Sequence, residues 1–305
     1  MLVKAFEEFC RVVKEKKLAV EGVAIADENE ILLERHFTAD KPRDIYSNTK
    51  SFMATAVGMA IGEGKLTLEA HLSDLLGDAL SEEARERLYP IQLKHLLTMT
   101  SGFGDAYLMM KERRAGVGVP DYLAYMAALP LREQPGTRFC YSTADSILAG
   151  MMVERAIGKN LAIYLYDHLF KPMGTGFPIW ETSPCGHTVG GSGLQLKLGD
   201  MIKLGQLYLA DGMWKGERLL DSKWIAQATR KQVETNNGSE DIWNCGYGYQ
   251  FWMSPYPGSY RADGSFGQVT TVLPKAGLVV AIQCPEEGCF ENVKTELHER
   301  VLSQL

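Results

Sequence analysis

The sequence predicts an α+β fold in which one antiparallel sheet combines strands from both ends of the chain, with a mostly helical segment inserted between them. Two observations carry this prediction. Strand-like apolar runs lie near the amino end, at 18–26 and 31–37, and near the carboxyl end, at 247–253, 268–273 and 278–284. Between them, apolar residues recur mainly at helical spacing. We therefore expect one lobe from residues 1–45 and 230–305, a helical lobe from 46–229, and a site in the cleft between them.

Each predicted element follows from a local pattern. Apolar residues at helical spacing make 3–13 an amphipathic first helix. The polar residues at 27–29 are a turn signal, so the strands on either side form a hairpin, and a second turn at 274–277 separates the last two strands. Helical spacing predicts a closing helix over 286–305 and helices in the middle of the chain at 49–63, 93–99, 122–129, 144–157, 161–170 and 200–210.

Composition restricts the class of protein. The 305 residues are 46% hydrophobic and 23% charged, with a net charge of −6, which is ordinary globular composition. A nucleic-acid-binding protein would show a basic stripe, and no apolar run approaches the ~20 residues of a membrane span. The cysteines include no CxxC pair, and the acidic start of the chain lacks the apolar segment of a signal peptide. We therefore expect reduced cysteines, a cytoplasmic location, and neither nucleic acid nor membrane as a partner.

The first candidate for chemistry is Ser47-Asn48-Thr49-Lys50, which precedes an apolar helical face. A serine where a helix begins meets free backbone N–H groups and the positive end of the helix dipole, which favours developing negative charge. Lys50 falls on the same helix face as Ser47, and burial would lower its pKa so that it can take the hydroxyl proton. A simpler interpretation is a serine helix cap followed by a solvated lysine. Because roughly one SxxK is expected by chance in such a chain, the spacing alone decides little.

Two further segments fit the same chemistry. Tyr141 stands in a loop between two predicted helices, where a phenol near a lysine ammonium loses its proton more easily and can act as a general base. The segment 262–268 contains Gly264 and Gly267 and enters a predicted strand, so that a backbone N–H there can bind an oxyanion. Taken singly, a buried tyrosine with a satisfied hydroxyl and a glycine-rich hairpin are the simpler interpretations.

Other chemistries find little support in the sequence. The segment 190–194 departs from a GxSxG nucleophile turn at its last position, Leu194. The histidines form neither an HExxH motif nor a pair at metal-binding spacing, and no glycine-rich phosphate loop occurs. We therefore expect neither a metal site nor a nucleotide site.

In combination, these segments resemble the serine β-lactamase and penicillin-binding-protein superfamily, in particular its class C-like branch, which includes esterases and peptidases. The resemblance runs nearly end to end, and the joint pattern is far more specific than any one motif. Its motifs, in the family's order, are the segment 46–52, the Leu-Leu-Thr-Met-Thr-Ser-Gly-Phe run at 96–103, Tyr141-Ser142-Thr143, the turn 169–174, the segment 191–194 with Asp200, and the segments 247–249 and 264–268. The resemblance implies a β-lactamase-like fold and a serine hydrolase that needs neither a metal nor an organic cofactor.

The resemblance also implies a role for each catalytic residue. Ser47 is the acylated nucleophile, and Lys50 and Tyr141 share the proton transfers. The backbone N–H groups of Ser47 and Ser265 form the oxyanion hole, an effect worth about 3–4 kcal/mol per donor in other hydrolases.

The positions that the resemblance places next to the substrate are Thr143, Asp263 and Gly264. Thr143 stands where class C β-lactamases carry asparagine, and Ala262 stands where they carry the lysine of their KTG segment, so an amide and a cation that would bind a β-lactam are missing. Asp263 adds an acid there, and strand alternation turns Arg261 to the face opposite Ala262. We therefore predict poor activity on β-lactams and a preference for small esters, amides or D-amino-acid peptides.

The leading hypothesis is a serine hydrolase that works through an acyl-enzyme on a small-molecule substrate. A penicillin-binding D,D-peptidase is the runner-up, and the missing export signal argues against it. A binding or sensor protein without turnover is the third hypothesis. If it had lost the chemistry, Ser47, Lys50 or Tyr141 would be missing, and all three are present. A sensor that stays acylated would keep Ser47 and lose deacylation, and this alternative stays open. The sequence leaves the oligomeric state open.

Overall fold

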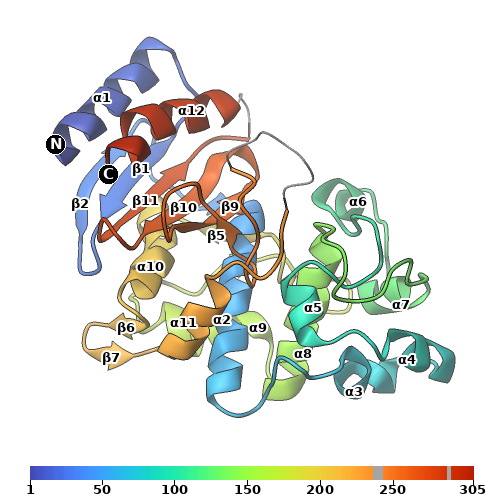
Figure 1. Cartoon of the computed structure of the whole chain (residues 1–305). Coiled ribbons are helices and arrows are strands. Elements are labelled where there is room, and N and C mark those ends of the chain that lie inside the picture. Colours follow the sequence, from blue (N-terminus) through green and yellow to red (C-terminus); the bar gives the residue numbers. More distant parts are fainter. Residues whose placement is uncertain (236–242, 287–289) are drawn as a thin grey trace.

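Strands from both ends of the chain form one six-stranded antiparallel sheet. The computed structural model describes residues 1–235, 243–286 and 290–305. In the sheet order β2-β1-β11-β10-β9-β8, the first strand region of the chain lies directly beside the last (Figure 1). The α+β prediction is therefore confirmed. The bounds are β1 (Gly22–Ala26), β2 (Ile31–His36), β8 (Trp252–Met253), β9 (Tyr260–Gly264), β10 (Gln268–Leu273) and β11 (Leu278–Gln283).

Helices cover both faces of this sheet. On one face, Phe9 and Leu297 share an apolar cluster with Ile25 and Ile282 of the strands. On the other face, Gly205 lets a helix approach closely, since a Cβ there would lie 2.4 Å from Cγ1 of Val279. Because both faces are covered, β1 is buried along its whole length. The covering helices are α1 (Leu2–Glu15) and α12 (Phe290–Arg300) on the first face, side by side in Figure 1, and α10 (Leu198–Leu209) on the second.

The helical part of the molecule is arranged around α2 (Thr49–Gly62), which runs through the middle of the molecule in Figure 1. This helix is buried continuously from Thr49 to Ala60, as expected for a helix that is apolar on all sides. The longest neighbour is α8 (Thr143–Ile157), also buried over most of its length. The other helices are η1 (Tyr46–Asn48), α3 (Leu72–Leu76), η2 (Gly77–Ala79), α4 (Glu82–Leu88), α5 (Leu93–Leu97), α6 (Met110–Arg114), α7 (Tyr122–Ala127), α9 (Leu161–Leu165), η3 (Tyr166–Phe170), α11 (Ser222–Ala228), η4 (Ser265–Gly267) and η5 (Leu302–Gln304).

Two small sheets complete the fold. One has the order β3-β5-β4, so that the chain just before η1 is paired with the chain that follows Gly193. The other is the hairpin of β6 and β7. Their bounds are β3 (Arg43–Asp44), β4 (Ile179–Trp180), β5 (Leu194–Leu196), β6 (Met213–Trp214) and β7 (Glu217–Arg218).

Several elements differ from the sequence prediction. Of the strand expected over 247–253, only Trp252 and Met253 form a regular strand, because the chain turns before them with the N–H of Gly248 on the carbonyl of Phe251. The short helices α3, α4, α6 and α11 were not predicted. They are too short for an apolar period, and two of them begin at a cap, Ser81 for α4 and Asp221 for α11. The closing helix, expected from 286, is described from Phe290, and 287–289 lie outside the described residues.

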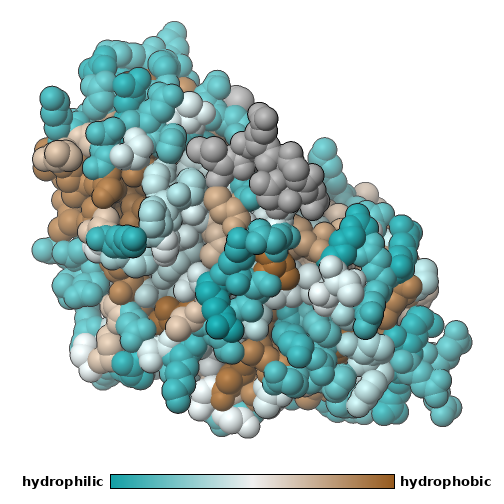
Figure 2. All heavy atoms as spheres, viewed as in Figure 1, coloured by the Kyte–Doolittle hydropathy of each residue, from teal (hydrophilic) through white to brown (hydrophobic). Residues whose placement is uncertain are grey.

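The surface facing the viewer in Figure 2 is mostly hydrophilic, with hydrophobic areas between the hydrophilic ones and a larger one on the left of the view. Of the helices in the described ranges, none has the length and apolar character that a membrane crossing requires. Cys10 and Cys284 are both buried and form no disulfide with any described residue. The boundaries that we predict for the two lobes, at 45/46 and 229/230, stay predictions, and α10 from the expected helical segment packs on the sheet.

Candidate active site

Ser47 is presented by a short irregular turn at the start of α2. It lies in η1, partly exposed between buried neighbours. Tyr46 has a φ of 47°, and its N–H donates to Oδ1 of Asp44 at 2.7 Å. The side-chain amide of Asn48 donates to the carbonyls of Ala262 at 3.2 Å and Gln268 at 3.0 Å. These bonds hold the turn against β9 and β10, so the position of the Ser47 hydroxyl is fixed relative to the sheet.

Gly264 explains how closely the strand passes this turn. A Cβ at this position would lie 2.1 Å from the carbonyl oxygen of Ile45 and 3.1 Å from the nitrogen of Asn48. Only glycine permits this approach. Ser265, the next residue, lines the same pocket as Ser47. The two residues predicted to supply oxyanion-hole N–H groups are therefore brought together.

Lys50 lies one helical turn beyond Ser47 and is almost entirely buried. Its Nζ is 3.3 Å from Oγ of Ser47, donates to the carbonyl of Gly191 at 2.8 Å, and lies 3.4 Å from Oγ1 of Thr143. Burial lowers the pKa of Lys50 to about 7, and the nearby charge of Arg113 lowers it as well. A large share of Lys50 is therefore an uncharged amine near neutral pH.

Tyr141 completes the group. Nζ of Lys50 lies 5.1 Å from the centre of the Tyr141 ring. The ring stacks on Trp252, with 5.5 Å between the ring centres, and meets Tyr247 edge to face. Burial raises the pKa of the phenol, while hydrogen bonds with Ser47 and Trp252 act in the opposite direction. Because burial dominates, the phenol keeps its proton at neutral pH, and the uncharged amine of Lys50 is the available base.

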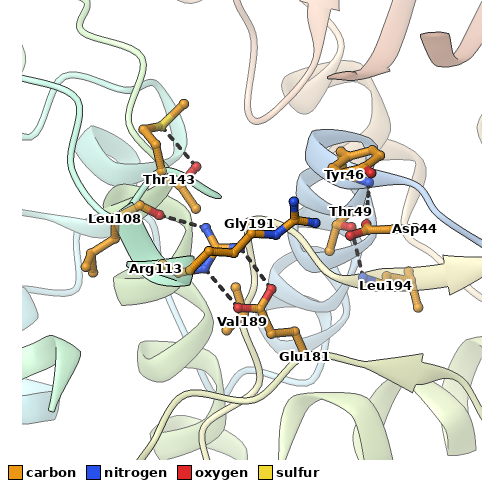
Figure 3. Close-up of polar contacts among 12 residues, drawn as sticks. Asp44, Tyr46, Thr49, Leu108, Arg113, Thr143, Glu181, Val189, Gly191 and Leu194 are labelled. Atoms are coloured by element: carbon orange, nitrogen blue, oxygen red, sulfur yellow. Dashed lines mark hydrogen bonds and ion pairs between the residues drawn. The ribbon is translucent and has the colours of Figure 1, made fainter. Parts of the chain in front are cut away.

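Thr143 differs in position from the other residues expected at the substrate. It is buried at the first turn of α8, and its hydroxyl donates to Sδ of Met109 at 3.3 Å (Figure 3). With Nζ of Lys50 on its other side, Thr143 borders the lysine at the base of the site. A side chain at Gly191 would be excluded here, since its Cβ would lie 2.8 Å from Cγ2 of Thr143.

The pocket above Ser47 has a volume of about 390 Å³. Asp263 faces this pocket, whereas Ala262 is buried. Arg261 lines it as well. Arg261 and Ala262 lie on opposite faces of β9, as expected, but the face that meets the pocket is that of Arg261. The expectation that no cation lies near the substrate position is therefore wrong. The lining residues are Ser47, Met109, Tyr141, Trp243, Asn244, Trp252, Arg261, Asp263, Ser265 and Lys294.

Arg261 holds the aromatic wall of this pocket. Its Nε donates to Oδ2 of Asp263 at 2.8 Å. Its guanidinium carbon lies 5.3 Å from the ring centre of Trp243 and 5.7 Å from that of Trp252. The pairing largely neutralises Asp263, so the pocket wall is an aromatic surface with a compensated charge pair.

A second ion pair, Arg113 with Glu181, was also missed by the sequence analysis. Two nitrogens of the Arg113 guanidinium donate to the two carboxylate oxygens of Glu181, at 3.0 and 2.9 Å, and a third donates to the carbonyl of Leu108 (Figure 3). Arg113 is buried, and its charge opposes the protonation of Lys50. No local pattern connects residues so far apart in the sequence.

A larger pocket, of about 560 Å³, lies elsewhere on the molecule and contains none of the groups around Ser47. Its His187 is bonded to Glu154, with 2.6 Å between Nδ1 and Oε2. Across the described residues, no group of three or more His, Cys, Asp or Glu side chains is arranged to hold a metal ion.

Comparison with known proteins identifies the family of the chain. The family model described as Beta-lactamase matches residues 11–288. The chain belongs to the β-lactamase family. Among curated relatives, it is 28% identical over 142 residues to an N-acetylmuramyl-L-alanine amidase of Bacillus subtilis, which covers 43% of the chain and 31% of the relative. It is 28% identical over 191 residues to Esterase EstB of Burkholderia gladioli, which covers 54% and 48% respectively.

The solved structures support the fold. A penicillin-binding protein homologue from Caulobacter crescentus has a TM-score of 0.77 at 15% identity, and the match covers 100% of this chain and 97% of that one. The amidase, Esterase EstB and a putative D-alanyl-D-alanine carboxypeptidase of Escherichia coli O157:H7 are each matched over less than half of their own length. Putative D-alanyl-D-alanine carboxypeptidases of Salmonella are matched over 69% of their length at 22–23% identity. Relatives named as esterases, amidases and carboxypeptidases identify the β-lactamase-like serine hydrolases as the group to which this chain is similar.

Proposed function

We propose that the chain is a serine hydrolase that forms an acyl-enzyme on Ser47 with a small ester, amide or D-amino-acid peptide. One observation carries the proposal. The buried Nζ of Lys50, with a pKa of about 7, lies 3.3 Å from the Ser47 hydroxyl at the floor of a pocket. An amine that is largely uncharged at neutral pH and within reach of a hydroxyl is the arrangement that activates a serine nucleophile.

We propose the following proton transfers among these groups. Lys50 accepts the Ser47 proton as Oγ attacks the carbonyl carbon, and the backbone N–H groups of Ser47 and Ser265 stabilise the oxyanion. Tyr141 donates its phenolic proton to the leaving group and regains one from the Lys50 ammonium. In the second half, water attacks the ester carbonyl while its proton passes through Tyr141 to Lys50, and the lysine returns a proton to Oγ of Ser47. All protons are balanced within these groups.

Pocket chemistry supports the substrate class. The pocket is small, its wall is aromatic, and Asp263 is paired with Arg261. With Ala262 buried, the lysine that class C β-lactamases carry at this position has no counterpart there. We therefore propose weak activity on β-lactams. The names of the relatives, an esterase and an amidase among them, agree with ester and amide substrates.

The other hypotheses remain distinguishable. A D,D-peptidase would release D-alanine from a D-Ala-D-Ala peptide faster than it hydrolyses a simple ester. An acylated sensor would give one burst of product and no steady state. The cytoplasmic location stays a prediction.

The test is labelling with a fluorophosphonate together with turnover of a chromogenic ester. We expect Ser47→Ala to lose both label and turnover. Ser303→Ala, an exposed serine near the end of the chain, is the matched control and should retain both. Undiminished labelling of the Ser47→Ala protein would overturn the assignment of the nucleophile.

A further inference from the structure

Gln250 is a buried glutamine at the point where the chain turns before β8, and the proposed reaction does not yet use it. The residue is 2% exposed. Its φ of 62° lies in the left-handed region, which favours glycine over a residue with a side chain. A glycine would relieve this backbone strain, so the contacts of the glutamine side chain offset it.

The side chain of Gln250 joins two helices. Its Nε2 donates to the carbonyls of Leu96 at 3.2 Å and Leu97 at 3.0 Å, the last two residues of α5. Carbonyls at the end of a helix lack partners from a following turn, so these donors satisfy groups that the helix leaves open. The Oε1 of the amide accepts a hydrogen bond of 2.6 Å from the hydroxyl of Ser146 on α8. One side chain therefore fixes α5 relative to α8.

The backbone of Gln250 adds a third helix. Its carbonyl accepts a hydrogen bond of 2.7 Å from the hydroxyl of Ser51, which directly follows Lys50 on α2. Its N–H donates to the carbonyl of Leu97 at 3.1 Å. The bonds to Ser51, Ser146 and the end of α5 are all buried. Breaking any of them leaves a polar group unsatisfied in the interior, so α2, α5 and α8 are held in one arrangement.

The side chain of Lys50 lies between two of these helices, since α2 carries it and α8 borders it. Its Nζ donates to the carbonyl of Gly191 at 2.8 Å and lies 3.4 Å from Oγ1 of Thr143, in the first turn of α8. Gly191 fills the narrow space in front of α8: a Cβ there would lie 3.1 Å from Cβ of Ser146 and 3.2 Å from Nζ of Lys50. The serine that is bonded to Gln250 therefore packs against the glycine that holds the amine.

We propose that Gln250 is a positioning residue for this reaction: by tying α5 and α8 to α2, it holds Nζ of Lys50 within reach of Oγ of Ser47. The inference rests on the proposed function, in which Lys50 takes the proton of Ser47. The two atoms are 3.3 Å apart, slightly more than an ordinary hydrogen bond, so a small displacement of either helix breaks the contact. Gln250 is not among the residues that line the pocket, and it exchanges no proton.

The test is steady-state hydrolysis of a chromogenic ester by Gln250→Met. Methionine has nearly the same length and keeps the backbone strain, but it removes the three side-chain hydrogen bonds. We expect kcat to fall about 10–10²-fold with KM unchanged, because the proton transfer is misaligned while the pocket wall stays in place. Unchanged kcat in the folded variant would overturn the proposal. A rise of KM alone would also overturn it, since Gln250 would then act on the pocket.

Gln206→Met is the matched control, because Gln206 is also a buried glutamine with a bonded amide. It lies on α10, and its Nε2 donates to the carbonyl of Asp27 at 2.9 Å. Both variants should lower Tm, since each loses hydrogen bonds of a buried amide. Only Gln250→Met should lower kcat at a temperature well below Tm. An equal loss of kcat in the two variants would reflect stability alone and would refute a positioning role.

A second measurement determines whether the effect passes through Lys50. The rate at which a fluorophosphonate labels Ser47 is compared in Lys50→Met with and without Gln250→Met. If Gln250 acts by placing the amine, its replacement should leave the slow residual rate unchanged once the amine is gone. A further fall by the factor seen when Lys50 is present would show a role independent of Lys50, and the proposal would be wrong.

Ser146→Ala covers the case in which Gln250→Met does not fold. It removes one hydroxyl and leaves the bonds of Gln250 to α5 and α2, so kcat should fall by a smaller factor. Unchanged kcat in folded Ser146→Ala would then overturn the proposal. Failure of the proposed function has a different signature, because Ser47→Ala would retain label and turnover. If the inference alone fails, Ser47→Ala is inactive while Gln250→Met stays fully active.

Discussion

Replacing Gly264 by alanine tests whether the approach of β9 to the serine turn sets the catalytic geometry. The new Cβ would lie 2.1 Å from the carbonyl oxygen of Ile45, against about 3.4 Å for an ordinary contact. Strand and turn must therefore separate by about 1.3 Å. The nearest atom is backbone, so no side chain can rotate away to relieve the contact. We expect a loss of about 1–3 kcal/mol in the free energy of unfolding.

The same displacement moves the Ser265 N–H away from an oxyanion bound at Ser47. Oxyanion donors act at 2.7–3.1 Å, so a shift of this size removes most of one donor's effect, and kcat should fall about 10²–10³-fold. The assay is steady-state hydrolysis of a chromogenic ester, with urea denaturation in parallel. Gly62→Ala is the matched control, since nothing lies within 4 Å of the added methyl and its φ is not in the left-handed region. Wild-type kcat in a folded Gly264→Ala protein would refute the reasoning.

Two further predictions concern the proton-transfer groups. Tyr141→Phe keeps the ring that stacks on Trp252 and deletes only the hydroxyl, so kcat should fall about 10²–10⁴-fold with Tm unchanged; unchanged kcat would exclude Tyr141 from proton transfer. For the wild type, kcat/KM should rise with pH through about 7, because Lys50 must lose its proton to act as a base. Arg113→Met removes a cation that opposes protonation of Lys50, so the pKa of Lys50 rises. The rise of kcat/KM with pH should then occur at higher pH. Arg132→Met removes an exposed cation, so this control should leave the pH dependence of kcat/KM unchanged. A shift of the pH dependence to lower pH in Arg113→Met would contradict the electrostatic argument.

Local patterns account for the parts of the fold that the sequence predicts. The strand runs and turns at both ends are short-range signals, and they place β1, β2, β10 and β11. The prediction of a strand over 247–253 was wrong for most of its length. Tyr247, Tyr249 and Phe251 alternate as in a strand and are all buried. Each ring packs on different aromatic partners, Tyr247 on Trp252, Tyr249 on Trp224 and Phe251 on Tyr208, while the backbone turns at Gln250, whose φ is 62°. An alternating pattern of apolar residues does not distinguish a regular strand from an irregular segment that buries the same side chains.

In the candidate site, too, the sequence identifies the residues that are related by local spacing and misses those that only folding brings together. The three-residue spacing of Ser47 and Lys50 is local, so the sequence carries it, and their 3.3 Å contact follows from the helix. Arg113 and Glu181 are brought close only by folding, and no spacing identifies them. Arg261 and its partner Asp263 are two residues apart on the same face of β9. For β9, alternation separates Arg261 from Ala262, but which of the two faces the pocket depends on the register of the strand with β10.

The pairing of β1 with β11 has a consequence for synthesis of the protein. Gly22 pairs with Gln283, which is synthesised about 260 residues later. At about 5–20 residues per second, the first hairpin waits on the order of ten to fifty seconds for the strand beside it. During that interval β1, buried on both faces in the finished sheet, lacks its central neighbour. The sheet therefore closes only when β11 pairs with the much earlier β1, and during the wait the unpaired strand is exposed to aggregation, which competes with correct folding.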